Sequence, residues 1–403
     1  MNLGYKKEEK ERVVDSIRGC LMAGAAGDAL GYEVEFSSLN RIRLQYGKPG
    51  ITTFELDSQG KAQISDDTQM TLFTANGILM GQTRGHIRGI CSAYSDYAEC
   101  AYLDWYYTQY RSQVTTEPIT WLRDLPEMSQ LRAPGNTCLN ACECLLQRKP
   151  VINNSKGCGG IMRVAPIALF IAAANSRNIS LYTLPELAES GGQIARCTHK
   201  HPLGFLPASL LTILLYKIVP RSVKEVKEDI VRLVSETVDM LDKIYVDEFD
   251  SDKQYLKSLT NKAMQLALSN VSDDDAIRQL GEGWVAEETW AIALYSAVRH
   301  IDSVEEAIIA SVNHDGDSDS TGSVCGNIMG AIYGYEHIKE RNIFCPKGKT
   351  LEETLELSNI ILAIADDLTT GCIINEYNYN DTPEQRQWYE RYWLMKPAGI
   401  KKN

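Results

Sequence analysis

Gly19-Cys20-Leu21-Met22-Ala23-Gly24-Ala25-Ala26-Gly27-Asp28-Ala29-Leu30-Gly31 is the stretch from which the fold can be argued. Glycine or alanine recurs there at every fourth position, and Gly322, Gly326, Gly330 and Gly334 repeat the same spacing. Each glycine inside a helix costs about 1 kcal/mol relative to alanine. Because residues four apart share one helix face, we expect two core helices whose bare faces pack closely together. The alternative is that each helix packs against some other element.

Helix-compatible spacing continues along most of the chain, and no sustained period-two alternation indicates a large sheet. The clearest apolar stripe runs through the segment 223–245 at steps of three or four residues. The sequence therefore predicts an all-α fold. The predicted helices are 13–31, 67–80, 90–110, 138–147, 183–197, 203–219, 222–245, 254–269, 285–299, 304–312, 321–340 and 351–368.

The domain organisation follows from the absence of a linker in the sequence. At about 150 residues per domain, 403 residues would suggest two or three domains. No Pro/Ser-rich or low-complexity segment separates such units, and the acidic stretch 246–253 reads as a surface loop between helices. We expect one domain, 1–403, with a core of about 15–340 and a C-terminal helical extension over 341–403.

Composition narrows the classes of function. There are 53 acidic and 41 basic side chains, a net charge of −12, which argues against non-specific binding to nucleic acid or to anionic lipid. The apolar stretch 164–174 is too short to span a bilayer, and 203–219 is interrupted by Pro207 and Lys217. The N-terminus lacks the apolar core of a signal peptide. With 11 cysteines, an odd number, we expect reduced thiols and a cytoplasmic protein.

Two acidic clusters precede predicted helices. In the first, 64–68 (ISDDT), Ser65 is a natural N-cap, and acids in the first turn complement the helix dipole, so this cluster alone is typical of a well-capped helix. In the second, 313–321 (NHDGDSDST), three carboxylates within five residues repel one another unless a cation binds. The second cluster therefore favours a metal site.

The residue types limit which metal could bind. A calcium loop of the EF-hand type is excluded, because its sixth position would be Ser320 instead of Gly and its twelfth Gly326 instead of Glu. Cys138, Cys142 and Cys144 have no histidine nearby and read as a packed helix face instead of a zinc site. Carboxylates with small hydroxyls favour Mg²⁺ or Mn²⁺. Two such clusters could hold two cations, which leaves glycosidic, phosphoryl and peptide hydrolysis all open.

The order of the motifs then points to a family. The segments 27–31 (GDALG), 65–68 (SDDT), 157–166 (GCGGIMRVAP), 198–199 (TH) and 316–320 (GDSDS) together resemble the ADP-ribosylglycohydrolase family. The resemblance runs from about Gly19 to Gly334. It implies a compact orthogonal all-α domain with two Mg²⁺ (or Mn²⁺) ions at the base of a cleft.

The resemblance also implies roles for individual residues. The metal ligands would be Ser65, Asp66, Asp67, Asp317, Asp319 and Ser320, and the catalytic carboxylates Glu35, Asp66 and Asp317. Asp28 would support the ligands from behind. The substrate would be bound by Glu35, Gly157, Cys158, Gly159, Gly160, Met162, Arg163 and His199.

Some of these assignments leave alternatives. Cys158 stands where the family usually has Asn, and a thiol cannot replace the hydrogen bonds of an amide. Arg163 could pair with the pyrophosphate or with a core carboxylate. His199 alone would read as a structural histidine. Trp284, Glu287 and Glu288 could line the cleft, although the start of an ordinary helix is the favoured interpretation.

The implied activity is hydrolysis of the glycosidic bond between ADP-ribose and an acceptor, with ADP-ribosylated arginine on a protein as the first candidate. Small ADP-ribose conjugates are further candidates, and nucleic acid would enter only as an ADP-ribosylated substrate. Two alternatives remain. One is a catalytically silent binding, immunity or structural protein on the same scaffold, and the other is a metal-dependent nucleotide phosphohydrolase. Retention of an oxygen-bearing side chain at every metal-motif position favours the enzyme.

Overall fold

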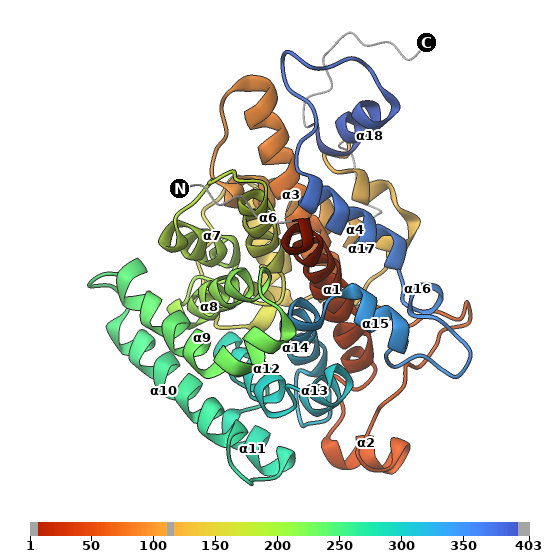
Figure 1. The fold of residues 1–403 in the computed structure, drawn as a ribbon, viewed down its shortest axis with the longest axis vertical. Coiled ribbons are helices and arrows are strands. Elements are labelled where there is room, and N and C mark those ends of the chain that lie inside the picture. The colour runs from red at the N-terminus through yellow and green to blue at the C-terminus, as the bar shows by residue number, and fades with distance from the viewer. Residues whose placement is uncertain (1–6, 111–116, 394–403) are drawn as a thin grey trace.

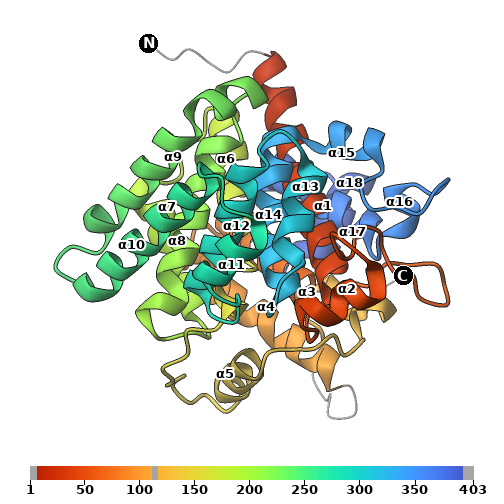
Figure 2. The ribbon, with the colours of Figure 1, turned by 90° about the horizontal axis from the view of Figure 1, so that it is seen from below.

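The two glycine-spaced segments form helices α1 (Lys7–Tyr32) and α14 (Ser318–Tyr333) in the computed structural model, which describes residues 7–110 and 117–393. The two helices lie side by side through the middle of the molecule (Figure 1 and Figure 2). Both are buried along most of their length. About 300 residues of sequence separate these two central helices.

The glycines are what allow this close approach. A Cβ atom added to Gly27 would lie 2.1 Å from the carbonyl oxygen of Gly322, and one on Gly330 would lie 2.1 Å from that of Gly19. At Gly326 it would lie 2.1 Å from the carbonyl oxygen of Ala23. No side chain fits at such distances, because the atoms it would meet are backbone. The prediction that the two glycine faces pack on each other is confirmed.

The remaining secondary structure within the described ranges is also helical. Only two isolated β-bridges occur there, Ala62 with Leu355 and Gly157 with Val285, so the predicted all-α fold is confirmed. The other helices are α2 (Leu39–Tyr46), α3 (Asp66–Arg88), α4 (Tyr94–Gln109), α5 (Asn136–Leu146), α6 (Ala165–Ser176), α7 (Leu184–Arg196), α8 (Pro202–Ile218), α9 (Val223–Ile244), α10 (Asp250–Ala267), α11 (Asp273–Leu280), α12 (Ala286–Arg299), α13 (Val304–Val312), α15 (Tyr335–Arg341), α16 (Leu351–Thr354), α17 (Ser358–Thr370) and α18 (Pro383–Tyr392), with short 3₁₀ turns η2 (Trp121–Asp124), η3 (Pro126–Met128) and η4 (Cys158–Gly160).

Other helices pack against the central pair. α12 and α13 pack on α14, whereas α6 and α17 pack on α1. One continuous hydrophobic core extends from Val13 to Tyr392 and so includes helices beyond residue 341. The division into a core of 15–340 and an extension of 341–403 stays a prediction, and residues 394–403 lie outside the described ranges.

Several helix boundaries differ from those predicted. The segment 321–340 is two helices, because Gly334 takes a φ of 83° between α14 and α15. The segment 351–368 is divided in the same way at Leu357, which has a φ of 57°. The predicted surface loop at 246–253 ends early, since α10 begins at Asp250. The helices α2, α6, α11 and α18 were not predicted.

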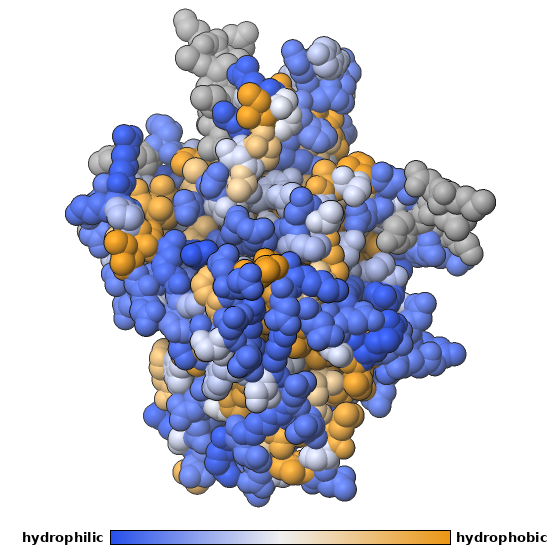
Figure 3. Space-filling model, turned by 90° about the vertical axis from the view of Figure 1, so that its left-hand side faces the viewer, coloured by the Kyte–Doolittle hydropathy of each residue, from blue (hydrophilic) through white to orange (hydrophobic). Residues whose placement is uncertain are grey.

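Helix α6 lies in the longest apolar part of the described chain. The stretch Cys158–Ser176 is long and apolar enough to cross a membrane by length and composition, but 83% of it is buried inside the protein. Burial of this kind is typical of a core helix. On the face shown in Figure 3, hydrophilic residues predominate and apolar ones form small scattered groups.

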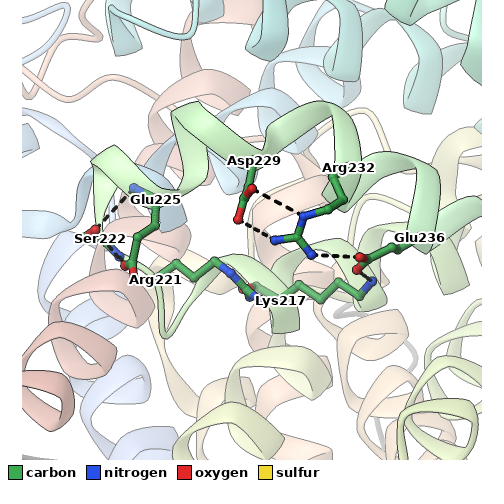
Figure 4. A network of polar contacts seen from close by, with 7 residues as sticks. All are labelled: Lys217, Arg221, Ser222, Glu225, Asp229, Arg232 and Glu236. Carbon is green, nitrogen blue, oxygen red and sulfur yellow. Dashed lines mark hydrogen bonds and ion pairs between the residues drawn. The ribbon is translucent and has the colours of Figure 1, made fainter.

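Helix α9 shows how an outer helix is held. Ser222 caps its start in a capping box with Glu225, and further along Arg232 bonds Asp229 and Glu236 (Figure 4). Lys217 of α8 also reaches Glu236, at 2.9 Å. Exposed ion pairs of this type contribute little. The buried stripe from Val226 to Leu241 is therefore what attaches α9 to the core.

Candidate active site

A pocket of about 180 Å³ lies between the N-terminal ends of α3 and α14, the two helices that follow the acidic clusters. Helix N-termini carry partial positive charge and free N–H groups. Five carboxylates face this pocket together with a glycine-rich loop and a histidine. Its lining consists of Glu35, Asp66, Asp67, Ala133, Gly135, Asn136, Thr137, Cys138, Gly157, Cys158, Gly159, Met162, His199, Trp284, Asp317, Asp319 and Ser320.

Hydrogen bonds to Asp28 of α1 hold the start of α3 in place. The hydroxyl of Ser65 caps the helix by accepting from the N–H of Asp67 at 3.1 Å. The carboxylate of Asp28 accepts from the N–H of Ser65 at 3.0 Å and from the N–H of Thr68 at 3.1 Å, and also from the Thr68 hydroxyl. Ser65 and Asp28 are buried and do not line the pocket. Asp28 thus holds the backbone that presents Asp66 and Asp67, the supporting position that the sequence predicts for it.

The start of α14 is built in a similar way. Asp317 is the N-cap residue and accepts from the N–H of Ser320 at 3.2 Å, while its own N–H donates to the carbonyl of Glu282 at 2.8 Å. Gly316 takes a φ of 140°, and a Cβ atom there would lie 1.9 Å from the Glu282 carbonyl oxygen. Asp319 accepts from the N–H of Ser320 at 2.9 Å. The second motif therefore needs its glycine to turn the chain into the helix.

Burial and mutual repulsion dominate the electrostatics of the pocket. Desolvation, then the neighbouring carboxylates, raise the pKa of Glu35 to about 10. Burial also raises the pKa values of Asp66, Asp67, Asp317 and Asp319, and that of Asp28 to about 7. A cluster of carboxylates in this condition binds protons or cations readily.

The oxygen donors of the pocket match a hard divalent cation. Oδ2 of Asp67 and Oε2 of Glu35 are buried and accept no hydrogen bond within the described chain. Buried acceptors of this kind normally have a partner. Among residues 7–110 and 117–393, no three His, Cys, Asp or Glu side chains stand close enough together to enclose an ion as placed. The donor types, carboxylates with small hydroxyls, fit Mg²⁺ or Mn²⁺.

The loop 157–162 brings Gly157, Cys158, Gly159 and Met162 to the pocket. The Cys158 thiol donates to Oδ2 of Asp317 at 2.8 Å, and its N–H donates to the carbonyl of Trp284 at 3.3 Å. Burial raises the pKa of Cys158 well above the ordinary value for a thiol. Where the family's asparagine usually stands, this chain therefore has a neutral thiol bonded to a predicted metal ligand.

Gly160 of this loop and Arg163, which directly follows the loop, are not brought to the pocket. Gly160 packs against α8, where a Cβ atom would lie 2.6 Å from the carbonyl oxygen of Gly204. Arg163 is fully buried and donates to the Thr198 hydroxyl at 2.6 Å and to the Ile194 carbonyl at 3.3 Å. Neither of the two partners considered for Arg163, pyrophosphate or a core carboxylate, is supported by this placement. Its position inside the core keeps it from direct contact with a ligand.

His199 lies at the pocket, as the motif predicts. Its Nδ1 is 2.8 Å from the Thr198 hydroxyl. Burial, reinforced by the nearby Arg163 charge, lowers the pKa of His199 to about 3, so the ring is neutral. A neutral imidazole offers one N–H donor and one acceptor.

Sequence reasoning missed one whole wall of the pocket, and for Trp284 it favoured a helix start over a place in the cleft. The wall is the segment 133–138, in which the N–H of Gly135 donates to Oδ2 of Asp66 at 3.2 Å. Its Pro134-Gly135-Asn136 run is a turn signal directly before a helix, and it could have been noticed. Trp284 precedes α12 instead of starting it, and it stacks on the exposed Phe36 beside the pocket, with ring centroids 5.9 Å apart.

Comparison with known proteins agrees with the motif order. The family model for ADP-ribosylglycohydrolase matches residues 9–373. The chain is 24% identical over 344 residues to the ADP-ribosyl-[dinitrogen reductase] glycohydrolase of Rhodospirillum rubrum, covering 81% of this chain and 88% of the relative. It is 24% identical to ADP-ribosylhydrolase ARH1 of Dictyostelium discoideum, covering 88% and 94%, and to ADP-ribosylhydrolase ARH3 of Danio rerio, covering 81% and 85%.

A solved structure shares the fold. The structure described as an ADP-ribosylglycohydrolase-related protein complex superposes with a TM-score of 0.55 at 20% identity and covers 91% of this chain and 99% of its own. The family model extends over nearly the whole chain. The protein therefore belongs to the ADP-ribosylglycohydrolase family.

Proposed function

We propose that the protein is a metal-dependent hydrolase that cleaves the glycosidic bond between ADP-ribose and an acceptor, and that the acceptor is an arginine side chain on a protein. The observation that carries the proposal is one pocket in which the two acidic helix starts, Asp66–Asp67 and Asp317–Asp319, face the same space as Glu35. The names of the relatives support the reaction class.

Two Mg²⁺ or Mn²⁺ ions fit the character of this pocket. The residues that would hold them are Asp66, Asp67, Asp317, Asp319 and Ser320, which line the pocket, together with Ser65, whose hydroxyl is buried at the start of α3; all of these side chains offer oxygen. When bound, the cations supply positive charge that offsets the carboxylates and attracts the hydroxyl oxygens of the ribose. An acidic pocket could then accept an anionic ligand.

The protein side chains would supply position and proton transfer. In the reaction, the bond from the anomeric carbon to the acceptor nitrogen breaks, a water oxygen bonds to that carbon, and the leaving nitrogen gains a proton. The carboxylates beside the carbon would stabilise the positive charge that develops on the sugar. Glu35, or one of the aspartates Asp66 and Asp317, would accept the proton of the water. The N–H of Gly135 would keep the carboxylate of Asp66 in place, and the N–H of Ser320 that of Asp317.

A substrate panel tests the proposal. The full chain would be assayed on ADP-ribosylated arginine, ADP-ribosylated serine and poly-ADP-ribose, each with Mg²⁺, with Mn²⁺ and with EDTA, and released ADP-ribose would be measured. We expect release from the arginine conjugate with either metal and none with EDTA.

The other outcomes decide between the alternatives. Release from serine or from poly-ADP-ribose alone would contradict the acceptor and keep the reaction class. Release of inorganic phosphate instead of ADP-ribose would indicate a nucleotide phosphohydrolase. If no conjugate is cleaved with any metal but ADP-ribose binds, the chain is a binding protein on this scaffold.

A further inference from the structure

Arg163 is a buried cation without a carboxylate partner among the described residues. Its side chain is 0% exposed, and its contacts are the Thr198 hydroxyl, the Ile194 carbonyl, the sulfur atoms of Met70 and Cys138 at 3.4 Å, and the Tyr102 ring at 4.3 Å. Removing an unpaired charge from water is costly. A packing role alone would be served better by an apolar side chain, so the guanidinium calls for another explanation.

The hydrogen-bond distances at Thr198 favour one direction for its hydroxyl proton. A guanidinium can only donate, so Thr198 Oγ1 accepts from Arg163 at 2.6 Å. The hydroxyl proton can then go to Nδ1 of His199 at 2.8 Å or to the Ala195 carbonyl at 3.4 Å. The shorter distance lies in the normal range for a hydroxyl donor and the longer does not. The nearby Cys138 thiol is a weak acceptor.

This direction determines where the proton of His199 resides. If Nδ1 accepts from Thr198, a neutral ring carries its proton on Nε2. Burial and the charge of Arg163 lower the pKa of His199, which keeps the ring neutral. The hydrogen-bond network, not an observed proton, assigns this tautomer.

The Nε2 edge of the ring is left open by two glycines. A Cβ atom on Gly157 would lie 3.0 Å from Nε2, and one on Gly159 would lie 3.5 Å from Nε2 and 3.0 Å from Cε1. Nε2 makes no hydrogen bond to any described residue, and His199, Gly157 and Gly159 all line the pocket. Because these two positions carry no side chain, Nε2 of His199 is not covered by the 157–159 segment.

We propose that Arg163 is a positioning residue that acts through Thr198: it occupies the acceptor side of the hydroxyl, directs the hydroxyl proton to Nδ1 of His199, and so fixes the tautomer that presents Nε2–H to the pocket. The use of this donor, to bond a phosphate or ribose oxygen of ADP-ribose, rests on the proposed function. The assignment of the tautomer is independent of that function.

Nitrogen NMR of the full chain labelled with ¹⁵N-histidine tests the tautomer, with the His199 signals identified by their loss in His199→Gln. We expect a directly bonded proton on Nε2 and an unprotonated Nδ1. Thr198→Val removes the hydroxyl at nearly constant volume, so the tautomer protonated on Nδ1 should appear in its spectrum. Thr198→Ser keeps the hydroxyl and should keep the wild-type pattern. Thr212→Val removes another buried hydroxyl, in α8, and should leave the His199 signals unchanged.

Arg163→Met gives the sharper result if the variant folds. Without the guanidinium, Thr198 can accept from Nδ1–H and donate to the Ala195 carbonyl, so the proton should move to Nδ1. A wild-type ring protonated on Nδ1, or a Thr198→Val spectrum identical to the wild type, would overturn the proposal. If Arg163→Met does not fold, the Thr198 pair decides alone.

A binding measurement separates this proposal from the proposed function. Calorimetric titration with ADP-ribose in the presence of Mg²⁺ should show a 5- to 10-fold weaker affinity for Thr198→Val, about 1 kcal/mol, and recovery in Thr198→Ser. Equal affinity in the wild type and Thr198→Val would overturn the role of the donor. If the wild type has the expected tautomer but does not bind ADP-ribose, the proposed function fails and the tautomer assignment stands.

Discussion

Asp28 acts on the pocket without entering it. Both of its carboxylate oxygens accept hydrogen bonds from the Ser65–Thr68 turn, and burial raises its pKa to about 7. This residue couples the central helix α1 to the start of α3. A change at Asp28 should therefore affect both folding stability and cation binding.

Asp28→Asn tests this role at the scale of a residue. An amide has one acceptor oxygen, and its NH₂ group would face the N–H and hydroxyl donors of the turn, so we expect a loss of about 1–3 kcal/mol in the free energy of unfolding. If the pocket holds cations, their affinity should fall about 10- to 100-fold. Chemical denaturation and Mn²⁺ titration measure the two effects. The exposed Asp124→Asn should change stability by less than about 0.5 kcal/mol, and an equal effect in both variants would contradict the role.

Which site residues were predictable depends on how local their signal is. Asp66, Asp67, Asp317 and Asp319 stand in short acidic runs directly before helices, and such runs are visible in the sequence. Trp284 reaches the pocket only through the packing of its loop beside Cys158, which no local pattern reveals. Arg163 was expected at the ligand or at a core carboxylate, because its segment resembles a loop that meets ADP-ribose, yet its side chain is buried in the core without either partner.

At the scale of elements, the contact between the glycine faces of α1 and α14 (the glycine seam) leaves no room for an added side chain. Gly330 lies at the end of the seam away from the pocket, where a Cβ atom would lie 2.1 Å from a backbone oxygen of α1. We expect Gly330→Ala to lower the free energy of unfolding by about 3 kcal/mol, since neither backbone can move aside.

Gly85→Ala is the matched control in a helix interior. A Cβ atom there would meet only the Cβ of Cys91, at an ordinary 3.4 Å, so the change should stabilise α3 by about 0.5–1 kcal/mol. Both values come from denaturant titration. Equal and small effects at the two positions would mean that the helices are not in backbone contact.

Asp273 links the start of α11 to the end of α12 through a pH-dependent contact. Its carboxylate bonds His300 at 3.1 Å and the Tyr295 hydroxyl at 2.7 Å, and these bonds, that of His300 first, lower its pKa below the ordinary 3.8. A lowered pKa means that the stabilisation is complete above the unfolded-state value and is lost as the pH falls through the folded-state value.

Asp273→Asn should therefore destabilise the protein at pH 7, by less than about 1 kcal/mol because the group is only half-buried. The difference from the wild type should disappear as the pH approaches 3. Stability curves over pH 3–7 measure it, with the surface ion-pair variant Asp275→Asn as control. A difference that grows toward acid pH would contradict the assignment.

The spacing of apolar residues and glycines in the sequence predicted the amphipathic helices and the two glycine-faced helices, but it did not predict several others. Helix α6 is apolar on every side, so no periodicity marks it. Helices α2 and α11 have eight residues each, about two turns, which is too short for an apolar spacing to repeat. The breaks at Gly334 and Leu357 both lie at a residue with a positive φ. Glycine adopts this conformation readily, and a Cβ atom at Gly334 would also lie 1.9 Å from Oδ2 of Asp15, whereas no local pattern marks the break at Leu357.

At the scale of the whole molecule, the segment beyond residue 341 supports the pocket. Glu356 pairs with Arg132 at 2.8 Å and accepts from the N–H of Ile64 at 3.1 Å, both groups being largely buried. Ile64 directly precedes the capping Ser65, and Arg132 precedes the 133–138 wall. The C-terminal part thus connects two walls of the candidate site.

Glu356→Gln should destabilise the protein by about 2 kcal/mol or more, because Arg132 loses its charge partner in a nearly buried position. Glu353→Gln, three residues earlier and exposed, keeps its capping box and should be close to neutral. Thermal and chemical denaturation compare the two. A neutral Glu356→Gln would contradict the structural connection.

The measurement that tests the central claim most directly is ADP-ribose release from an ADP-ribosylated arginine peptide by the wild type, Asp317→Asn and Asp315→Asn, with Mg²⁺ or Mn²⁺. Asparagine still caps a helix, so Asp317→Asn should fold normally and yet lose at least about 100-fold in rate. Asp315 lies two residues away, does not line the pocket, and bonds the N–H of Leu39, so Asp315→Asn should retain activity. Wild-type turnover by a folded, metal-supplied Asp317→Asn would contradict the claim that the two acidic helix starts form a hydrolytic centre.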